Sequence, residues 1–125
     1  GVKSLYGLEF AEETGVDGPS RYTAHMSGEG DLIDAYSTDG LLKKFDLVVL
    51  EDDKGAFPPY YAVPVFRSEV MEQYPEIAEV SQALGEVLTT ERMAELNYLV
   101  DEEDQDPRDV AHNFLAEYAP ELAAQ

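Results

Sequence analysis

The stretches that decide the fold are DLIDAYSTDG at residues 31–40 and FPPYYAVP at residues 57–64. Each combines a predicted strand with a tyrosine at one end of that strand, Tyr36 in the first stretch and Tyr60 in the second. A quaternary ammonium group has no N–H to donate, so proteins bind it through the faces of aromatic rings. Tyr36 and Tyr60 are therefore candidate walls of a cation cage. The alternative is that each tyrosine packs at the edge of the core.

Three strands are predicted in and between these stretches, at residues 31–37, 47–50 and 60–66. The run LVVL at residues 47–50 is the clearest of them, because β-branched apolar residues favour strands. Pro64 predicts an edge position or a bulge for the third strand, since proline cannot donate to a ladder. Side chains alternate along a strand, so only Tyr60 of the pair Tyr60-Tyr61 is expected to face a cleft.

Short helices are expected beside the strands, at residues 21–27 and after Asp39, and the chain is expected to be helical from residue 68 onward. This order predicts an α/β lobe of a solute-binding domain at residues 1–67. Residues 68–125 are expected to form a helical C-terminal segment of the same domain. The predicted fold class is therefore α/β.

Local signals predict where the later helices begin and end. Pro75 should end one helix and begin the next, because the first position of a helix needs no N–H donor. Thr89 or Thr90 is expected to cap the following helix, and Asp106, followed by Pro107, is expected to cap the last one.

Charge and composition exclude several classes of partner and site. The 125 residues include 27 acidic and 8 basic side chains, for a net charge of −19, and no cysteine. Nucleic acid and anionic lipid are excluded as primary partners, because phosphates repel so acidic a chain. Without cysteine there is no disulfide, zinc–thiolate site or thiol nucleophile. No signal peptide opens the chain, and no apolar window reaches the roughly 18–20 residues of a membrane span.

The run Ser37-Thr38-Asp39-Gly40 is a second candidate binding element. It places two hydroxyl groups and a helix N-terminus directly after a strand, an arrangement that can hold a carboxylate or a phosphate. The alternative, an ordinary helix cap, is the favoured interpretation of this run taken by itself.

The remaining polar residues predict neither a metal site nor a catalytic site. His25 and His112 are far apart in the sequence and have no second ligand at metal-binding spacing. The acidic runs at residues 51–53 and 101–106 lack calcium-loop spacing and are interpreted as solvated turns. We therefore expect no catalytic residue, no metal and no cofactor.

Five runs together resemble the C-terminal half of the osmoprotectant-binding proteins of ABC transporters. They are RYTA at residues 21–24, DAYSTDG at 34–40, KKFDLVVLEDDKG at 43–55, FPPYYA at 57–62 and ELNY at 95–98. The resemblance implies a type II periplasmic-binding-protein fold, of which this chain would supply one lobe plus C-terminal helices. It also implies a non-enzymatic protein that captures glycine betaine, choline or carnitine.

By the same resemblance, Tyr36 and Tyr60 would be the cage tyrosines of this half, with Thr38 and Asp39 beside them in the pocket. Arg21 is a weaker candidate partner for a ligand carboxylate. The expected protein partners are an ABC permease and its ATPase. The expected location is extracytoplasmic, periplasmic or at the cell surface, with a lipid anchor or a permease fusion outside this chain.

The chain departs from this family in length, because family members are about twice as long. The first lobe and its tyrosines would be missing, so apolar surface left uncovered could drive a homodimer of this fragment. The alternative function is a ligand-sensing or interaction domain that reuses the same fold without transport.

Overall fold

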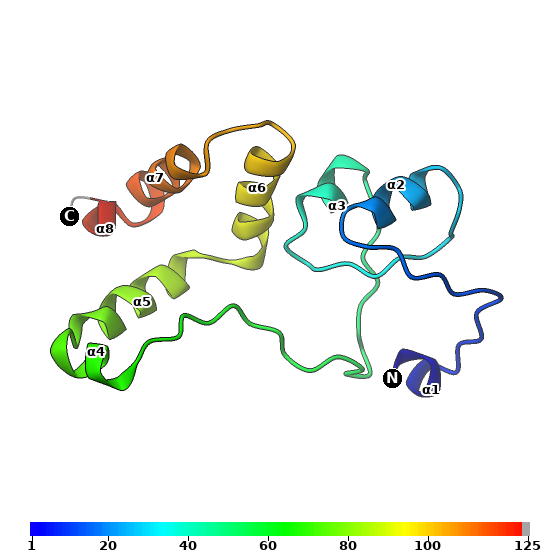
Figure 1. Cartoon of the computed structure of the whole chain (residues 1–125), viewed down its shortest axis with the longest axis horizontal. Helices are drawn as coiled ribbons and strands as arrows, with labels where there is room; N and C mark the ends of the chain where they lie inside the picture. Colours follow the sequence, from blue (N-terminus) through cyan, green and yellow to red (C-terminus); the bar gives the residue numbers. More distant parts are fainter. Residues whose placement is uncertain (124–125) are drawn as a thin grey trace. The chain divides into compact units, whose positions relative to one another are not determined.

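The computed structural model describes residues 1–123, and within that range it contains helices and no strand (Figure 1). The helices are α1 (Val2–Tyr6), α2 (Ser20–Met26), α3 (Gly40–Lys44), α4 (Ser68–Gln73), α5 (Glu76–Val87), α6 (Thr90–Asp101), α7 (Pro107–Tyr118) and α8 (Pro120–Ala123).

The predicted α/β class, as one lobe of a type II periplasmic-binding-protein fold, is wrong for residues 1–123. All three predicted strands, at residues 31–37, 47–50 and 60–66, form no ladder. Their apolar side chains are largely exposed, with Val48 at 85% and Val65 at 88%. A β-branched run favours a strand only when another strand accepts its hydrogen bonds and a second layer covers its side chains. Neither condition is met among the described residues.

The chain divides into two compact units, each built from two stretches of sequence. Unit 1 comprises residues 1–35 and 47–62, and unit 2 comprises residues 36–46 and 63–125. The division predicted from the sequence, into residues 1–67 and 68–125 of one partial domain, stays a prediction.

In unit 1, a cluster around Tyr6 and Asp52 joins α1 to the loop at residues 52–57. The Tyr6 hydroxyl donates to Asp52 Oδ1 over 2.6 Å and accepts the Lys54 N–H over 3.0 Å. Asp52 also accepts the N–H groups of Ala56 and Phe57, at 2.8 and 2.9 Å. This acidic run was predicted to be a solvated turn, but Asp52 is half-buried and organises the loop.

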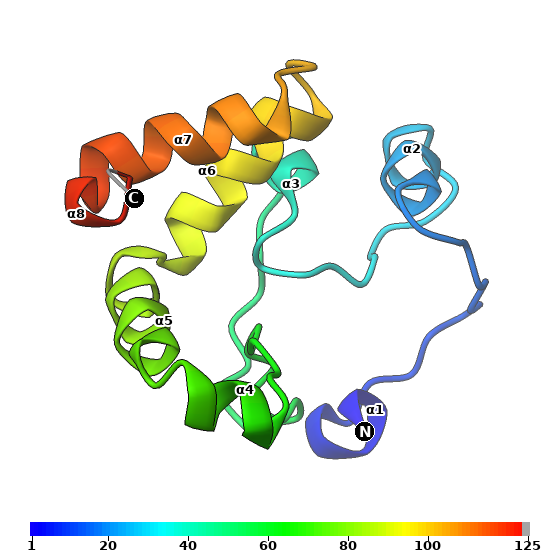
Figure 2. The same ribbon diagram turned by 60° about the vertical axis from the view of Figure 1, so that its left-hand side comes forward.

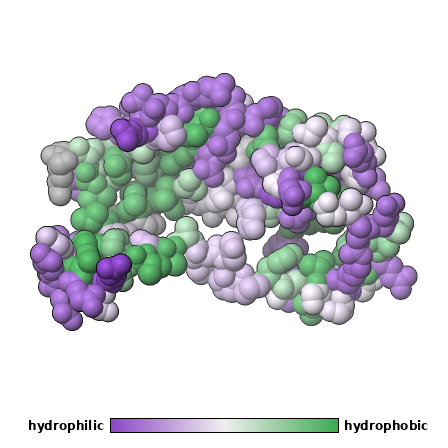
Figure 3. Space-filling model, in the orientation of Figure 1, coloured by the Kyte–Doolittle hydropathy of each residue, from purple (hydrophilic) through white to green (hydrophobic). Residues whose placement is uncertain are grey.

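In unit 2, α6 lies between α3 and α7, and it packs against both (Figures 1 and 2). Val110 and Phe114 of α7 are buried, and the Phe114 and Tyr118 ring centroids are 5.2 Å apart. Apolar side chains also remain at the surface of this unit, over α5 and along α7 (Figure 3), and Val80 of α5 is among the exposed ones.

The predicted helix boundaries in unit 2 are confirmed where they rested on local signals. Pro75 is the N-cap of α5 and separates it from α4. The Thr89 side chain accepts the Arg92 N–H at the start of α6, and the Asp106 carboxylate accepts the Arg108 N–H at the start of α7. These caps satisfy N–H groups that have no partner within the helix.

Candidate functional site

The candidate site is centred on the turn from Tyr36 to Asp39, which leads directly into α3. The Asp39 N–H donates to the Tyr36 carbonyl over 3.0 Å, and the Tyr36 N–H donates to Asp39 Oδ2 over 3.2 Å. These two hydrogen bonds close the turn at both ends. Asp39 is also the N-cap residue of α3, but its side chain makes no capping hydrogen bond to that helix.

The predicted site residues Tyr36, Thr38 and Asp39 are brought together by this turn. Thr38 and Asp39 are half-buried, whereas 53% of Tyr36 is exposed. An aromatic ring is therefore accessible to solvent on a hydrogen-bonded turn. The carboxylate of Asp39 lies in the same turn, where its Oδ2 accepts the Tyr36 N–H.

Tyr60 lies in the loop that follows the Asp52 cluster, and 84% of its surface is exposed. It belongs to unit 1, whereas Tyr36 belongs to unit 2. A cage formed jointly by these two tyrosines stays a prediction. The neighbouring Tyr61 is exposed to almost the same extent, at 82%.

Helix α6 supports the candidate turn through Asn97 and Tyr98, to which the sequence alone assigns no role. Asn97 Nδ2 donates to the Thr38 carbonyl over 2.8 Å, across 59 residues of sequence. At Gly40, an added Cβ would lie 2.7 Å from Tyr98 Cα, so the start of α3 lies directly against α6. Both contacts come from residues of the ELNY run, and nothing around them in the sequence indicated either contact.

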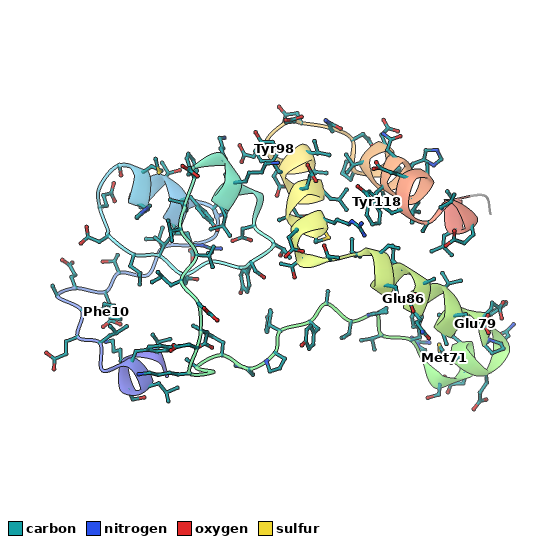
Figure 4. The ribbon with its side chains drawn as sticks, turned by 180° about the vertical axis from the view of Figure 1, so that it is seen from behind. Phe10, Met71, Glu79, Glu86, Tyr98 and Tyr118 are labelled. Carbon is teal, nitrogen blue, oxygen red and sulfur yellow. The ribbon has the colours of Figure 1, made fainter. Side chains whose placement is uncertain are left out.

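Two lysines of α3 strengthen this packing from the other end of the helix. Lys43 Nζ lies 5.4 Å from the centroid of the Tyr98 ring and 3.7 Å from Glu95 Oε1. Lys44 forms an ion pair with Glu102 at the end of α6. Tyr98 projects from α6, as Figure 4 shows, and the Lys43 contact places its ring beside α3.

A cavity of about 360 Å³ lies between α6 and α7, away from the predicted site. Arg92 of α6 places its guanidinium 4.0 Å from the centroid of the Tyr118 ring, which lies on α7 (Figure 4). The hydrogen bond to the Glu117 carboxylate raises the pKa of Tyr118, because it stabilises the protonated phenol. The cavity thus already contains a cation from this chain, and that cation joins the two helices.

Three further properties of residues 1–123 bear on function: metal binding, the contact of His25 and the capacity to span a membrane. No group of three or more His, Cys, Asp or Glu side chains in that range could hold a metal ion. His25 Nδ1 lies 2.8 Å from the Gly30 carbonyl oxygen, so it contributes to the loop after α2. Within the same range, no helix has both the length and the apolar character needed to span a bilayer.

Sequence comparison identifies the class of protein as a substrate-binding domain of an ABC-type transport system. Residues 1–117 match the family described as the substrate binding domain of the ABC-type glycine betaine transport system. The chain belongs to this family, and the resemblance found in its five sequence runs is confirmed. Domains of this family bind a substrate for transport and are not enzymes.

Three similar proteins illustrate the range of the family. The chain is 43% identical over 119 residues to a glycine-betaine-binding protein of Pseudomonas aeruginosa. It is 36% identical over 115 residues to an ergothioneine transport permease/ergothioneine binding protein of Helicobacter pylori. It is 34% identical over 110 residues to a carnitine transport binding protein of Listeria monocytogenes.

These alignments cover most of the chain but only a part of each relative. They include 94%, 92% and 88% of the chain, and 38%, 21% and 36% of the three relatives, in the order given above. The chain therefore spans about a fifth to two fifths of the length of these proteins.

Proposed function

We propose that this chain contributes to an extracytoplasmic solute-binding domain of an ABC importer that captures a quaternary-ammonium osmoprotectant. Glycine betaine, carnitine and ergothioneine, the solutes in the names of the three relatives, each carry a trimethylammonium group and a carboxylate. The proposed ligand class is therefore a small betaine, with choline as the analogue that lacks the carboxylate.

The observation that carries this proposal is the placement of Tyr36. Its accessible ring lies on a turn closed by two hydrogen bonds, with the Asp39 carboxylate in the same turn. We propose Tyr36 as one wall of the cage, with Thr38 and Asp39 beside it, and Tyr60 as a second wall. Each ring contributes roughly 0.5–1 kcal/mol to cation binding while it is exposed, and about 2 kcal/mol once water is removed.

The difference between exposed and desolvated rings favours a mechanism in which the binding domain closes around its ligand. Closure removes water from Tyr36 and Tyr60 and so strengthens both contacts. A ligand that binds the closed form more tightly shifts the population toward it. We propose that the permease recognises this closed form and that the ATPase then drives import.

Attachment to the membrane and self-association complete the proposal. A lipid anchor or a permease fusion would hold the domain beside its transporter, and the name of the Helicobacter relative combines permease and binding protein. A second copy of this chain is proposed as a further partner, bound through the apolar surface of unit 2.

The proposal is tested by calorimetric titration of the full-length gene product with glycine betaine and with choline. Tyr36→Ala and Tyr60→Ala should each weaken binding about 3–30-fold, as expected for the loss of one ring contact. Tyr61→Ala is the matched control for Tyr60, and Tyr74→Ala, at the end of α4, is the control for Tyr36. Equal affinity in all four variants would contradict the assigned site, and no binding by the wild type would contradict the proposed ligand class.

A further inference from the structure

Asn97 makes a side-chain hydrogen bond to the middle of the candidate turn. Its Nδ2 atom donates to the carbonyl oxygen of Thr38 over 2.8 Å, in a half-buried environment. Thr38 lies between Tyr36 and Asp39, whose backbones are hydrogen-bonded to each other. A hydrogen bond that holds the Thr38 carbonyl therefore constrains the whole turn, including Tyr36.

The next residue along α6 provides a second point of support. Gly40 lies so close to Tyr98 that an added Cβ would be 2.7 Å from Tyr98 Cα and 2.8 Å from Tyr98 N. This contact fixes the distance between α3 and α6 at the end of the turn. A steric contact limits only the distance between two elements. The hydrogen bond from Asn97 also constrains the direction of the Thr38 carbonyl.

We infer that Asn97 is a positioning residue for ligand binding, which acts through Thr38 to hold the Tyr36 ring in the orientation that receives the cation. The inference rests on the proposed function and extends it to a residue that does not touch the ligand. Its physical basis is preorganisation: a ring already held in its bound orientation loses less conformational freedom when the ligand arrives.

The test uses Asn97→Asp and Asn97→Ser in the full-length gene product. Aspartate has the shape of asparagine but presents no amide donor to Thr38, and serine is too short to reach it. We expect the Kd for glycine betaine and for choline to rise about 3–10-fold in both variants, as for the loss of one hydrogen bond. Asn113→Asp, on the exposed surface of α7, is the matched control and should leave the Kd unchanged.

A second readout separates positioning from a purely structural role. The Kd is measured well below the unfolding midpoint of each ligand-free variant, so that every sample is folded. A lower midpoint with an unchanged Kd in both variants would overturn the inference, while leaving the proposed function intact. Absence of binding by the wild type would overturn both. A raised Kd in the Asn97 variants, with Asn113→Asp unchanged, supports the inference.

Discussion

The hydroxyl group of Tyr6 donates a 2.6 Å hydrogen bond to the carboxylate of Asp52, which is 46 residues away in the sequence. This bond joins α1 to the loop at residues 52–57 that precedes Tyr60. It raises the pKa of Tyr6 to about 12, and it is also the main reason why the pKa of Asp52 is lowered. Both shifts favour the same state, a protonated phenol beside an ionised carboxylate.

The raised pKa of Tyr6 predicts a loss of stability in alkaline solution. The protonated phenol is favoured in the folded chain, so its stabilising effect is fully present below pH 10, the ordinary tyrosine pKa. The effect should disappear as the pH rises from 10 toward 12. We expect wild type to resist urea better than Tyr6→Phe at pH 8, and this advantage to shrink above pH 10.

The control for this experiment is Tyr61→Phe, which changes an exposed tyrosine in the same unit. Its difference from wild type is measured at the same pH values, between 8 and 11, as the reference for Tyr6→Phe. A Tyr6→Phe difference that stays constant over this range would contradict the role assigned to the hydrogen bond. The lowered pKa of Asp52 makes stability depend on pH in the opposite sense. The contribution of its carboxylate to folding stability is present above pH 3.8 and is lost as the pH falls.

Gly40→Ala should destabilise unit 2, because the new Cβ would lie 2.7 Å from the backbone of Tyr98. Moving α3 away from α6 is expected to cost about 1–3 kcal/mol of unfolding free energy, as for other overpacked sites. Urea unfolding followed by far-ultraviolet circular dichroism measures this change.

Gly85→Ala provides the control, since Gly85 lies within α5 and a Cβ there meets nothing within 4 Å. Alanine should raise the unfolding free energy by about 0.5–1 kcal/mol through its higher helix propensity. If both alanine variants were equally stable, the close approach of α3 and α6 would be disproved.

Arg92 and Tyr118 should be energetically coupled, because the guanidinium lies 4.0 Å from the ring centroid between α6 and α7. A double-mutant cycle with Arg92→Gln and Tyr118→Leu should give a coupling energy of about 0.5–1 kcal/mol. A second cycle pairs Tyr118→Leu with Arg108→Gln, at the first turn of α7, and should give no coupling energy. Equal coupling in the two cycles would show that the ring contact makes no specific contribution.

The features predicted correctly from the sequence depend on neighbouring residues. Asp106 caps α7 through the N–H of a residue two positions away, and Pro75 separates two helices by its own geometry. The start of α3 directly after Asp39 was also predicted from neighbouring residues, although the strand predicted before it was not found. Patterns of this kind can be read within one short window of sequence.

The features that were missed depend on distant residues. The run at residues 47–50 has the composition of a strand, but composition does not supply a pairing partner, and none is present within residues 1–123. Helix α1 was not predicted, and its tie to Asp52 crosses 46 residues. Asn97 lies 59 residues from the carbonyl it binds, so nothing near it in the sequence indicated that contact.

The exposed valines at residues 48 and 65 have a consequence for handling the protein. Extended β-branched segments without neighbours are templates for intermolecular pairing, the first step of amyloid-like aggregation. At neutral pH the net charge of −19 opposes non-specific pairing of these segments, but this repulsion vanishes near the isoelectric point of about 4.1 and is screened by concentrated salt. Purification in dilute buffer near pH 7 therefore protects the chain from its own least covered segments.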